Sequence, residues 1–94
     1  MDILTFKASV DREEPPTKLS LELEALWHAA KGNWETAHKI AQRSKSISGA
    51  WVHAYLHRVE GDLSNARYWY CKAGHPEASS PLQEEWRIIA ETLL

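Results

Sequence analysis

The sequence predicts an all-α domain, and three observations carry that prediction. After Lys18, apolar residues recur every three or four positions along most of the chain, which is the spacing of one helix face. Glycines separate these apolar runs, and no β-hairpin dipeptide or sustained alternation of apolar and polar residues appears. A chain of 94 residues is long enough for one domain with one modest core.

Residues 1–16 are predicted to form an N-terminal segment and linker, followed by a single helical-repeat domain over residues 17–94. The stretch that starts at Asp11 is charged and ends on two successive prolines, which do not continue a helix. The ordered domain is therefore expected to begin between Thr17 and Ser20. The segment before the linker is expected to be loosely attached, with docking on the domain and mobility both left open.

Five helices are predicted in the domain, each with one apolar stripe. They span about residues 19–32, 33–44, 48–60, 62–73 and 80–94. Glycine ends the first, third and fourth of them, because it readily adopts the left-handed conformation that closes a helix.

Residues with short polar side chains are placed to start several of these helices. Asn33 and Asp62 each follow a glycine and are predicted N-caps. The run Ser80-Pro81-Leu82-Gln83 predicts a serine cap, with proline at the first helical position and glutamine at the third.

An internal repeat with an offset of 29 residues appears when Gly32 is placed over Gly61. The alignment pairs His28 with His57, and the flanking positions agree in kind for about two turns on each side. It predicts two helix hairpins that bury their apolar faces against each other, with the last helix as the closing element.

Two stretches resemble known helical repeats. Residues 60–74, EGDLSNARYWYCKAG, resemble the second half of a tetratricopeptide or Sel1-like repeat, and residues 26–37, LWHAAKGNWETA, resemble a turn-centred version of the same unit. Residues 53–62, HAYLHRVEGD, also resemble a set of small uncharacterised bacterial helical proteins. The resemblance implies two tetratricopeptide-like antiparallel helix hairpins plus a C-terminal capping helix, in a scaffold that binds another protein and supplies no catalytic residue.

Composition excludes several classes of function. A net charge of −2 without a basic run argues against binding to nucleic acid or to anionic lipid. No segment has the 18 or so apolar residues of a membrane span, and the N-terminus lacks the basic region of a secretory signal, so a cytoplasmic location is expected. The single cysteine, Cys71, allows no intrachain disulfide.

Histidines on the third predicted helix offer a candidate metal site. His53 and His57 are four residues apart, and Glu60 follows three residues later, all opposite the apolar stripe. The repeat offset places Glu24 over His53 and His28 over His57, so equivalent helices could present these four side chains toward each other. Imidazoles with a carboxylate suit zinc or nickel, and the metal-site candidates are His28, His53 and His57. The favoured interpretation is a solvated polar helix face on which His57 pairs with Glu60 or with neighbouring helices.

Two functions remain open, and a small protein-interaction module is the favoured one. No catalytic motif is present, so no catalytic residue and no cofactor are predicted. The tryptophans fall in the apolar stripes and are predicted core, whereas Tyr68 points away from its stripe toward a partner. The partner-binding candidates are Glu24, His28, His53, His57, Glu60 and Tyr68. The expected partner is a protein or peptide, with self-association left open; the alternative is a metal or small-ligand binding protein that uses Glu24, His28, His53 and His57.

Overall fold

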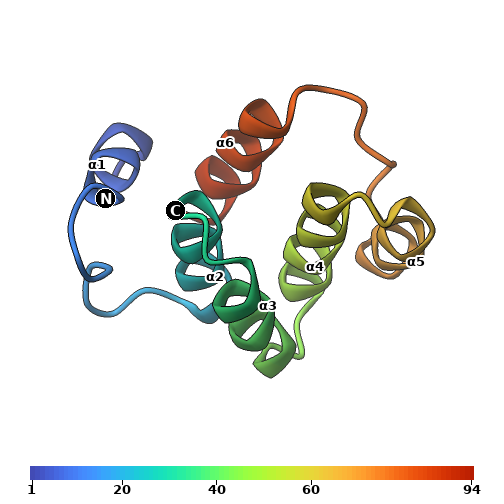
Figure 1. Cartoon of the computed structure of the whole chain (residues 1–94), viewed down its shortest axis with the longest axis horizontal. Helices are drawn as coiled ribbons and strands as arrows, with labels where there is room; N and C mark the ends of the chain where they lie inside the picture. The colour runs from blue at the N-terminus through green and yellow to red at the C-terminus, as the bar shows by residue number, and fades with distance from the viewer.

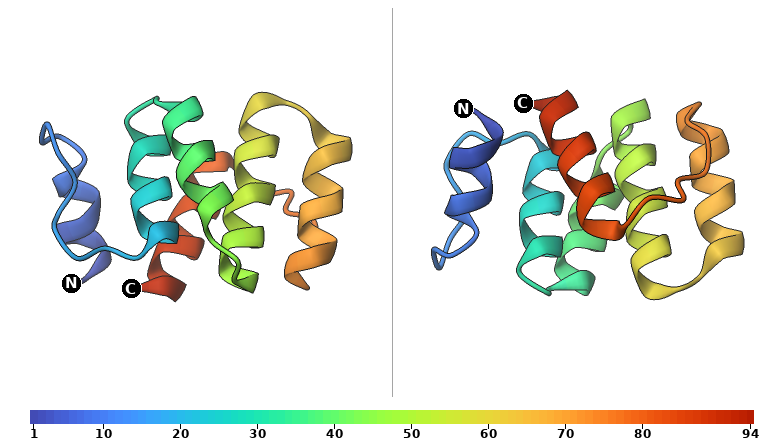
Figure 2. Two further views of the ribbon diagram at one scale, coloured as in Figure 1. Left: turned by 90° about the horizontal axis from the view of Figure 1, so that it is seen from below. Right: turned by 90° about the horizontal axis from the view of Figure 1, so that it is seen from above.

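The computed structural model describes all 94 residues and contains six helices and no strand, which confirms the all-α prediction. The helices are α1 (Ile3–Ser9), α2 (Leu21–Ala30), α3 (Trp34–Arg43), α4 (Ile47–Glu60), α5 (Leu63–Ala73) and α6 (Leu82–Leu93). Helices α2 and α3 form one hairpin and α4 and α5 a second one beside it (Figure 1). Helix α6 crosses α2 and α4 on the side opposite α3, and α1 lies beyond α2 at one end of the row (Figure 2).

The turns of the two hairpins have the same geometry. Gly32 and Gly61 have φ angles of 87° and 86°, a region that favours glycine. The Asn33 N–H donates to the His28 carbonyl at 2.9 Å, and 29 residues later the Asp62 N–H donates to the His57 carbonyl at 3.0 Å. These equivalent bonds satisfy helix-end carbonyls in the same way, so the sequence offset corresponds to a local structural equivalence.

The predicted helix starts hold in part. The Asp62 carboxylate accepts the Asn65 N–H at 3.2 Å, as a cap should, whereas the Asn33 side chain makes no capping bond. Helix α6 begins one residue later than a Ser80 cap would place it, with Pro81 in the capping position. Ser80 instead supplies its carbonyl to the Arg58 guanidinium, a contact made only in the folded chain.

Helix α1 was not predicted, and it docks on the domain. The Asp2 carboxylate caps it by accepting the Thr5 N–H at 2.8 Å. Phe6 is fully buried and its ring stacks on Trp86 with centroids 5.6 Å apart. Seven residues are too short for a periodicity signal, and an isolated helix of this length is unstable in water. Tertiary packing therefore orders this segment, in place of the expected loose attachment.

A single apolar core runs between the helices. Trp27, Trp51 and Trp86 belong to it as predicted, while Trp34 and Trp69 are only partly buried at its edge. Helix α4 is central, and nine successive residues from Gly49 to His57 are buried. Neighbouring helices therefore cover the polar face of α4 as well as its apolar stripe.

A carboxylate is buried at the junction of α4, α5 and α6. Glu85 is 3% exposed, and one of its oxygens accepts from Arg58 at 2.8 Å while the other accepts the Tyr70 hydroxyl. Burial and the Glu85 charge raise the pKa of Tyr70 well above its usual range. Burial, with the same charge, raises the pKa of nearby Tyr55 to about 12. The side chains of Arg58, Tyr70 and Glu85 are all paired, so this cluster is a structural feature.

The protein is expected to lose stability in alkaline solution through Tyr55. The phenol of Tyr55 has a pKa of 10.0 in the unfolded chain and of about 12 in the folded one. Its contribution to the free energy of unfolding is therefore complete below pH 10 and is lost as the pH rises through 12. The loss from this residue should be roughly 2 kcal/mol. Urea unfolding between pH 8 and 12 should show a shallower decline for Tyr55→Phe than for the wild type. The exposed control Tyr68→Phe should follow the wild type, and equal slopes for all three would contradict the assignment.

Candidate functional site

Three histidines meet between α3 and α4, in a group called here the histidine cluster: His38, His53 and His57. One ring nitrogen of each lies within 4.8 Å of those of the other two. The ring centroids are 5.0 Å apart for His38 and His53, 5.3 Å for His38 and His57, and 6.0 Å for His53 and His57. Helix α4 supplies two of the rings one turn apart, and α3 supplies the third from across the helix interface.

Aromatic side chains hold two of these rings from outside. The Trp34 ring stacks on His38 with centroids 4.8 Å apart, and its indole N–H donates to the Leu56 carbonyl at 2.7 Å. The Trp69 ring of α5 stacks on His53 with centroids 4.0 Å apart and planes 13° apart. Each of these two imidazoles therefore packs face to face against one indole ring.

The third ring is oriented by a carboxylate. His57 Nδ1 lies 2.7 Å from a Glu60 oxygen, as the sequence pattern predicts. The prediction of a solvated face is wrong, however, because His53 is only 4% exposed and His57 only 5%. Helices α3 and α5 flank α4 and remove this face from water.

His53 has a buried nitrogen with no hydrogen-bond partner, Nδ1. Burial, followed by repulsion from His38, His57 and Lys72, lowers the pKa of His53 from 6.5 to about 4. Burial also lowers the pKa of His38, which is only partly buried. These two rings are therefore neutral at pH 7.

The structure does not bring together all four residues paired by the repeat. Glu24 and His28, both on α2, belong to neither of the two groups of ligand-type side chains in the molecule. The His28 ring instead packs edge-on against Trp27 with centroids 5.0 Å apart. His53 and His57 meet His38 in place of these two residues. The roles of Glu24 and His28 in partner binding stay predictions.

The geometry of stacked repeats explains this difference. Two units stacked in the same orientation present equivalent positions in the same direction, so His28 and His57 do not face each other. Helix α3 packs against α4 and offers His38 to it. In the sequence, His38 stands four residues after Trp34, which is a stacking distance on a helix, but nothing in that spacing identifies the helix it faces.

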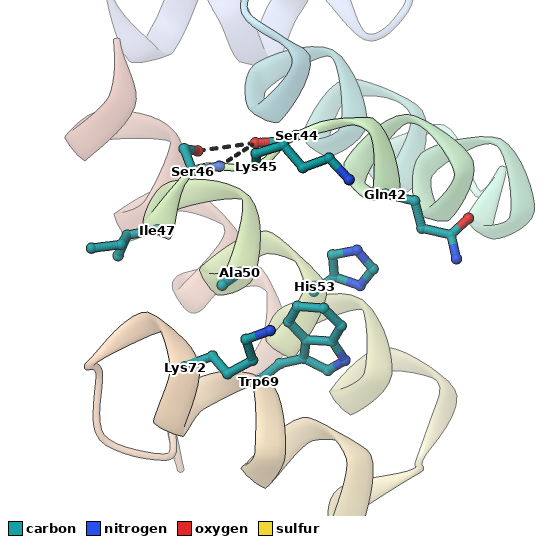
Figure 3. A pocket seen from close by; sticks show the side chains of 9 residues that line it. All are labelled: Gln42, Ser44, Lys45, Ser46, Ile47, Ala50, His53, Trp69 and Lys72. Carbon is teal, nitrogen blue, oxygen red and sulfur yellow. Dashed lines mark hydrogen bonds between the residues drawn. The ribbon is translucent and has the colours of Figure 1, made fainter.

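A surface groove adjoins the histidine cluster and is called here the α3–α5 groove. It has a volume of about 470 Å³ and is lined by Gln42, Ser44, Lys45, Ser46, Ile47, Ala50, His53, Trp69 and Lys72. Figure 3 shows Lys45 and Lys72 approaching it from the α3–α4 connection and from α5, with the rings of His53 and Trp69 side by side within it. The groove thus combines apolar surface from Ile47, Ala50 and Trp69 with two ammonium groups.

The exposed aromatic residue predicted from the sequence lies next to this groove. Tyr68 is 57% exposed, and its ring meets the Trp69 ring edge-on with centroids 5.4 Å apart. The Lys72 ammonium lies 5.5 Å from the Tyr68 ring centre and 5.0 Å from that of Trp69. Sequence reasoning missed both Lys45 and Lys72, since exposed lysines are ordinary on a helical surface and only the fold places these two on one groove.

Comparisons with family models, with curated proteins and with solved structures find no match to this chain. No helix of the structure has the length and apolar character needed to cross a membrane.

Proposed function

We propose that the chain is a small helical-repeat protein-interaction module, a scaffold or adaptor, that binds an acidic segment of a partner protein in the α3–α5 groove. The observation that carries the proposal is the pair of lysines, Lys45 and Lys72, beside the apolar surface of Ala50 and Trp69. Ile47, which is 68% exposed, adds apolar surface at the rim of the groove.

Charge and aromatic character define the partner chemistry. Two ammonium groups favour carboxylates and disfavour a basic segment, because like charges brought together at an interface are costly. Tyr68 and Trp69 add the kind of aromatic surface that dominates binding energy at protein interfaces. The partner segment is therefore acidic with at least one apolar or aromatic side chain.

The proposal also covers the class of helical repeat, the source of the protein and its cellular location. We assign the two hairpins to the tetratricopeptide-like class, supported by the matching turns at Gly32 and Gly61. A bacterial source is supported by the resemblance of residues 53–62, and a cytoplasmic location by a lone, unpaired Cys71. No catalytic activity is assigned.

A peptide-display selection against the full chain tests the groove. The wild type should enrich acidic peptides that contain an aromatic or aliphatic residue. Binding should weaken about tenfold or more in Lys45→Glu and in Lys72→Glu, with the larger loss at low salt, and about tenfold in Tyr68→Ala.

The matched control is Lys31→Glu, since the Lys31 ammonium also lies over an indole, 5.4 Å from the Trp27 ring centre, but outside the groove. It should bind like the wild type. Enrichment of basic peptides, equal loss in the control, or sedimentation showing that the surface is covered only by a second copy of the chain would each contradict the proposal.

A further inference from the structure

We propose that the histidine cluster, His38, His53 and His57, binds a divalent transition-metal ion, with zinc as the best match. This site shares His53 with the wall of the α3–α5 groove, but metal binding needs no partner. Three imidazoles with one position left for water form a donor set that zinc accepts in proteins. The proposal replaces the combination suggested by the repeat, because His38 takes the place of His28.

The spacing of the rings fits such an ion. A nitrogen at about 2.0–2.1 Å from zinc puts its ring centre about 3.2 Å from the metal, and tetrahedral angles then separate the ring centres by about 5.2 Å. The observed separations are 5.0, 5.3 and 6.0 Å. The ring nitrogens lie within 4.8 Å of one another, and binding of an ion would require side-chain rotations that bring them to a common point.

The surroundings support ligation by holding the rings. Trp34 stacks on His38, and Trp69 stacks on His53. This packing already restricts the rotation of the two imidazoles, so the binding of an ion costs less conformational entropy. Glu60 bonds Nδ1 of His57, and a carboxylate on the other nitrogen is the usual orienting partner of a metal-binding histidine. The nitrogen of His57 that remains for a metal is then Nε2.

The cluster also leaves a polar atom unsatisfied, which a ligand would explain. His53 is 4% exposed and its Nδ1 has no hydrogen-bond partner. Buried polar atoms are nearly always paired. Nδ1 of His28 on α2 is unpaired as well, but only the unpaired nitrogen of His53 belongs to a side chain that lies beside two other imidazoles.

Two charged side chains face the cluster and act in opposite directions. Glu60 attracts a cation, whereas Lys72, whose ammonium lies 5.0 Å from the Trp69 ring centre, repels it. Lys72→Ala should therefore bind zinc more tightly than the wild type. That shift would be opposite to the effect of Lys72 replacement on peptide binding, so the two sites are distinguishable.

A second group of ligand-type residues shares one member with the cluster and must be separated from it: His57, Glu60 and Asp62. Asp62 caps α5, so its removal has a structural effect of its own. Asp62→Ser keeps a capping side chain and removes the carboxylate, which makes it the control for this alternative.

Titration of the full, metal-free chain with zinc tests the proposal, with calorimetry for affinity and cobalt absorption for geometry. We expect one ion per chain and tetrahedral cobalt bands. His38→Gln should weaken binding by more than about 100-fold, and Glu60→Gln by about 10–100-fold, as for an orienting group. His28→Gln and Asp62→Ser should bind like the wild type.

His38 is the ligand to vary first because it is only partly buried, so its variant should fold, as circular dichroism without metal would verify. X-ray absorption on the zinc-loaded wild type supplies a count of imidazole ligands that depends on no variant. The proposal is overturned if the wild type does not bind zinc, or if X-ray absorption finds fewer than three imidazole ligands on the bound zinc. It is also overturned if folded His38→Gln binds zinc with unchanged affinity, or if binding is lost in Asp62→Ser but kept in His38→Gln.

Discussion

Replacing Glu85 with alanine is expected to lower the free energy of unfolding by about 3 kcal/mol or more. The carboxylate accepts from Arg58 at 2.8 Å and from the Tyr70 hydroxyl, and it joins α4, α5 and α6. Removing it leaves the guanidinium of Arg58, whose side chain is 15% exposed, without its counter-charge. The cost comes from this stranded charge more than from the lost hydrogen bonds.

Chemical denaturation of a matched pair measures the effect. The neighbouring Glu84 is exposed, and Glu84→Ala should change stability by less than about 0.5 kcal/mol. The double variant Arg58→Ala with Glu85→Ala should cost less than the two single changes added together, because it removes both charges. Additive losses, or a loss below about 1 kcal/mol for Glu85→Ala, would show that the pair does not stabilise the fold.

Trp86→Ala is expected to cost about 3–5 kcal/mol. The indole is 6% exposed, stacks on Phe6 of α1 and donates its N–H to the Leu26 carbonyl of α2 at 2.8 Å. One side chain of α6 thus joins the two N-terminal helices to the end of the chain. Its removal leaves a large cavity at that junction.

Hydrogen exchange distinguishes this role from a general loss of stability. In Trp86→Ala the amides of α1 should exchange sooner than those of α5, because Phe6 loses its stacking partner. Ile88→Ala on the same helix is the control, since Ile88 is 39% exposed, and it should cost less than about 1 kcal/mol. Equal acceleration throughout the molecule would contradict the junction role.

Local signals predicted the helical body because they depend only on near neighbours in the chain. Gly61 and Gly74 occupy left-handed positions at the ends of α4 and α5, and Asp62 caps α5, all as their residue types indicate. The pairing of His57 with Glu60, three residues apart, is similarly local. Interactions within one turn of helix are fixed once the helix forms, so the sequence is enough to predict them.

Tertiary structure alone decided the features that depend on which helices meet. A seven-residue α1 is ordered only by packing Phe6 against Trp86, 80 residues away. Adjacent glutamates at 84 and 85 look alike in sequence, but one is exposed and the other is buried against Arg58. Local pattern identifies a residue's helix face, whereas burial and contacts depend on the neighbour that covers that face.

The histidine cluster combines both kinds of information. The sequence by itself determined that His53 and His57 share one face of one helix, because four residues make slightly more than one turn. It could not determine that α3 would lie across that face and supply His38, or that Trp69 of α5 would cover His53. Helix α4 has neighbours on both sides, α3 and α5, and their packing removes the face with His53 and His57 from water. Two histidines whose spacing is typical of an exposed helix face are therefore buried.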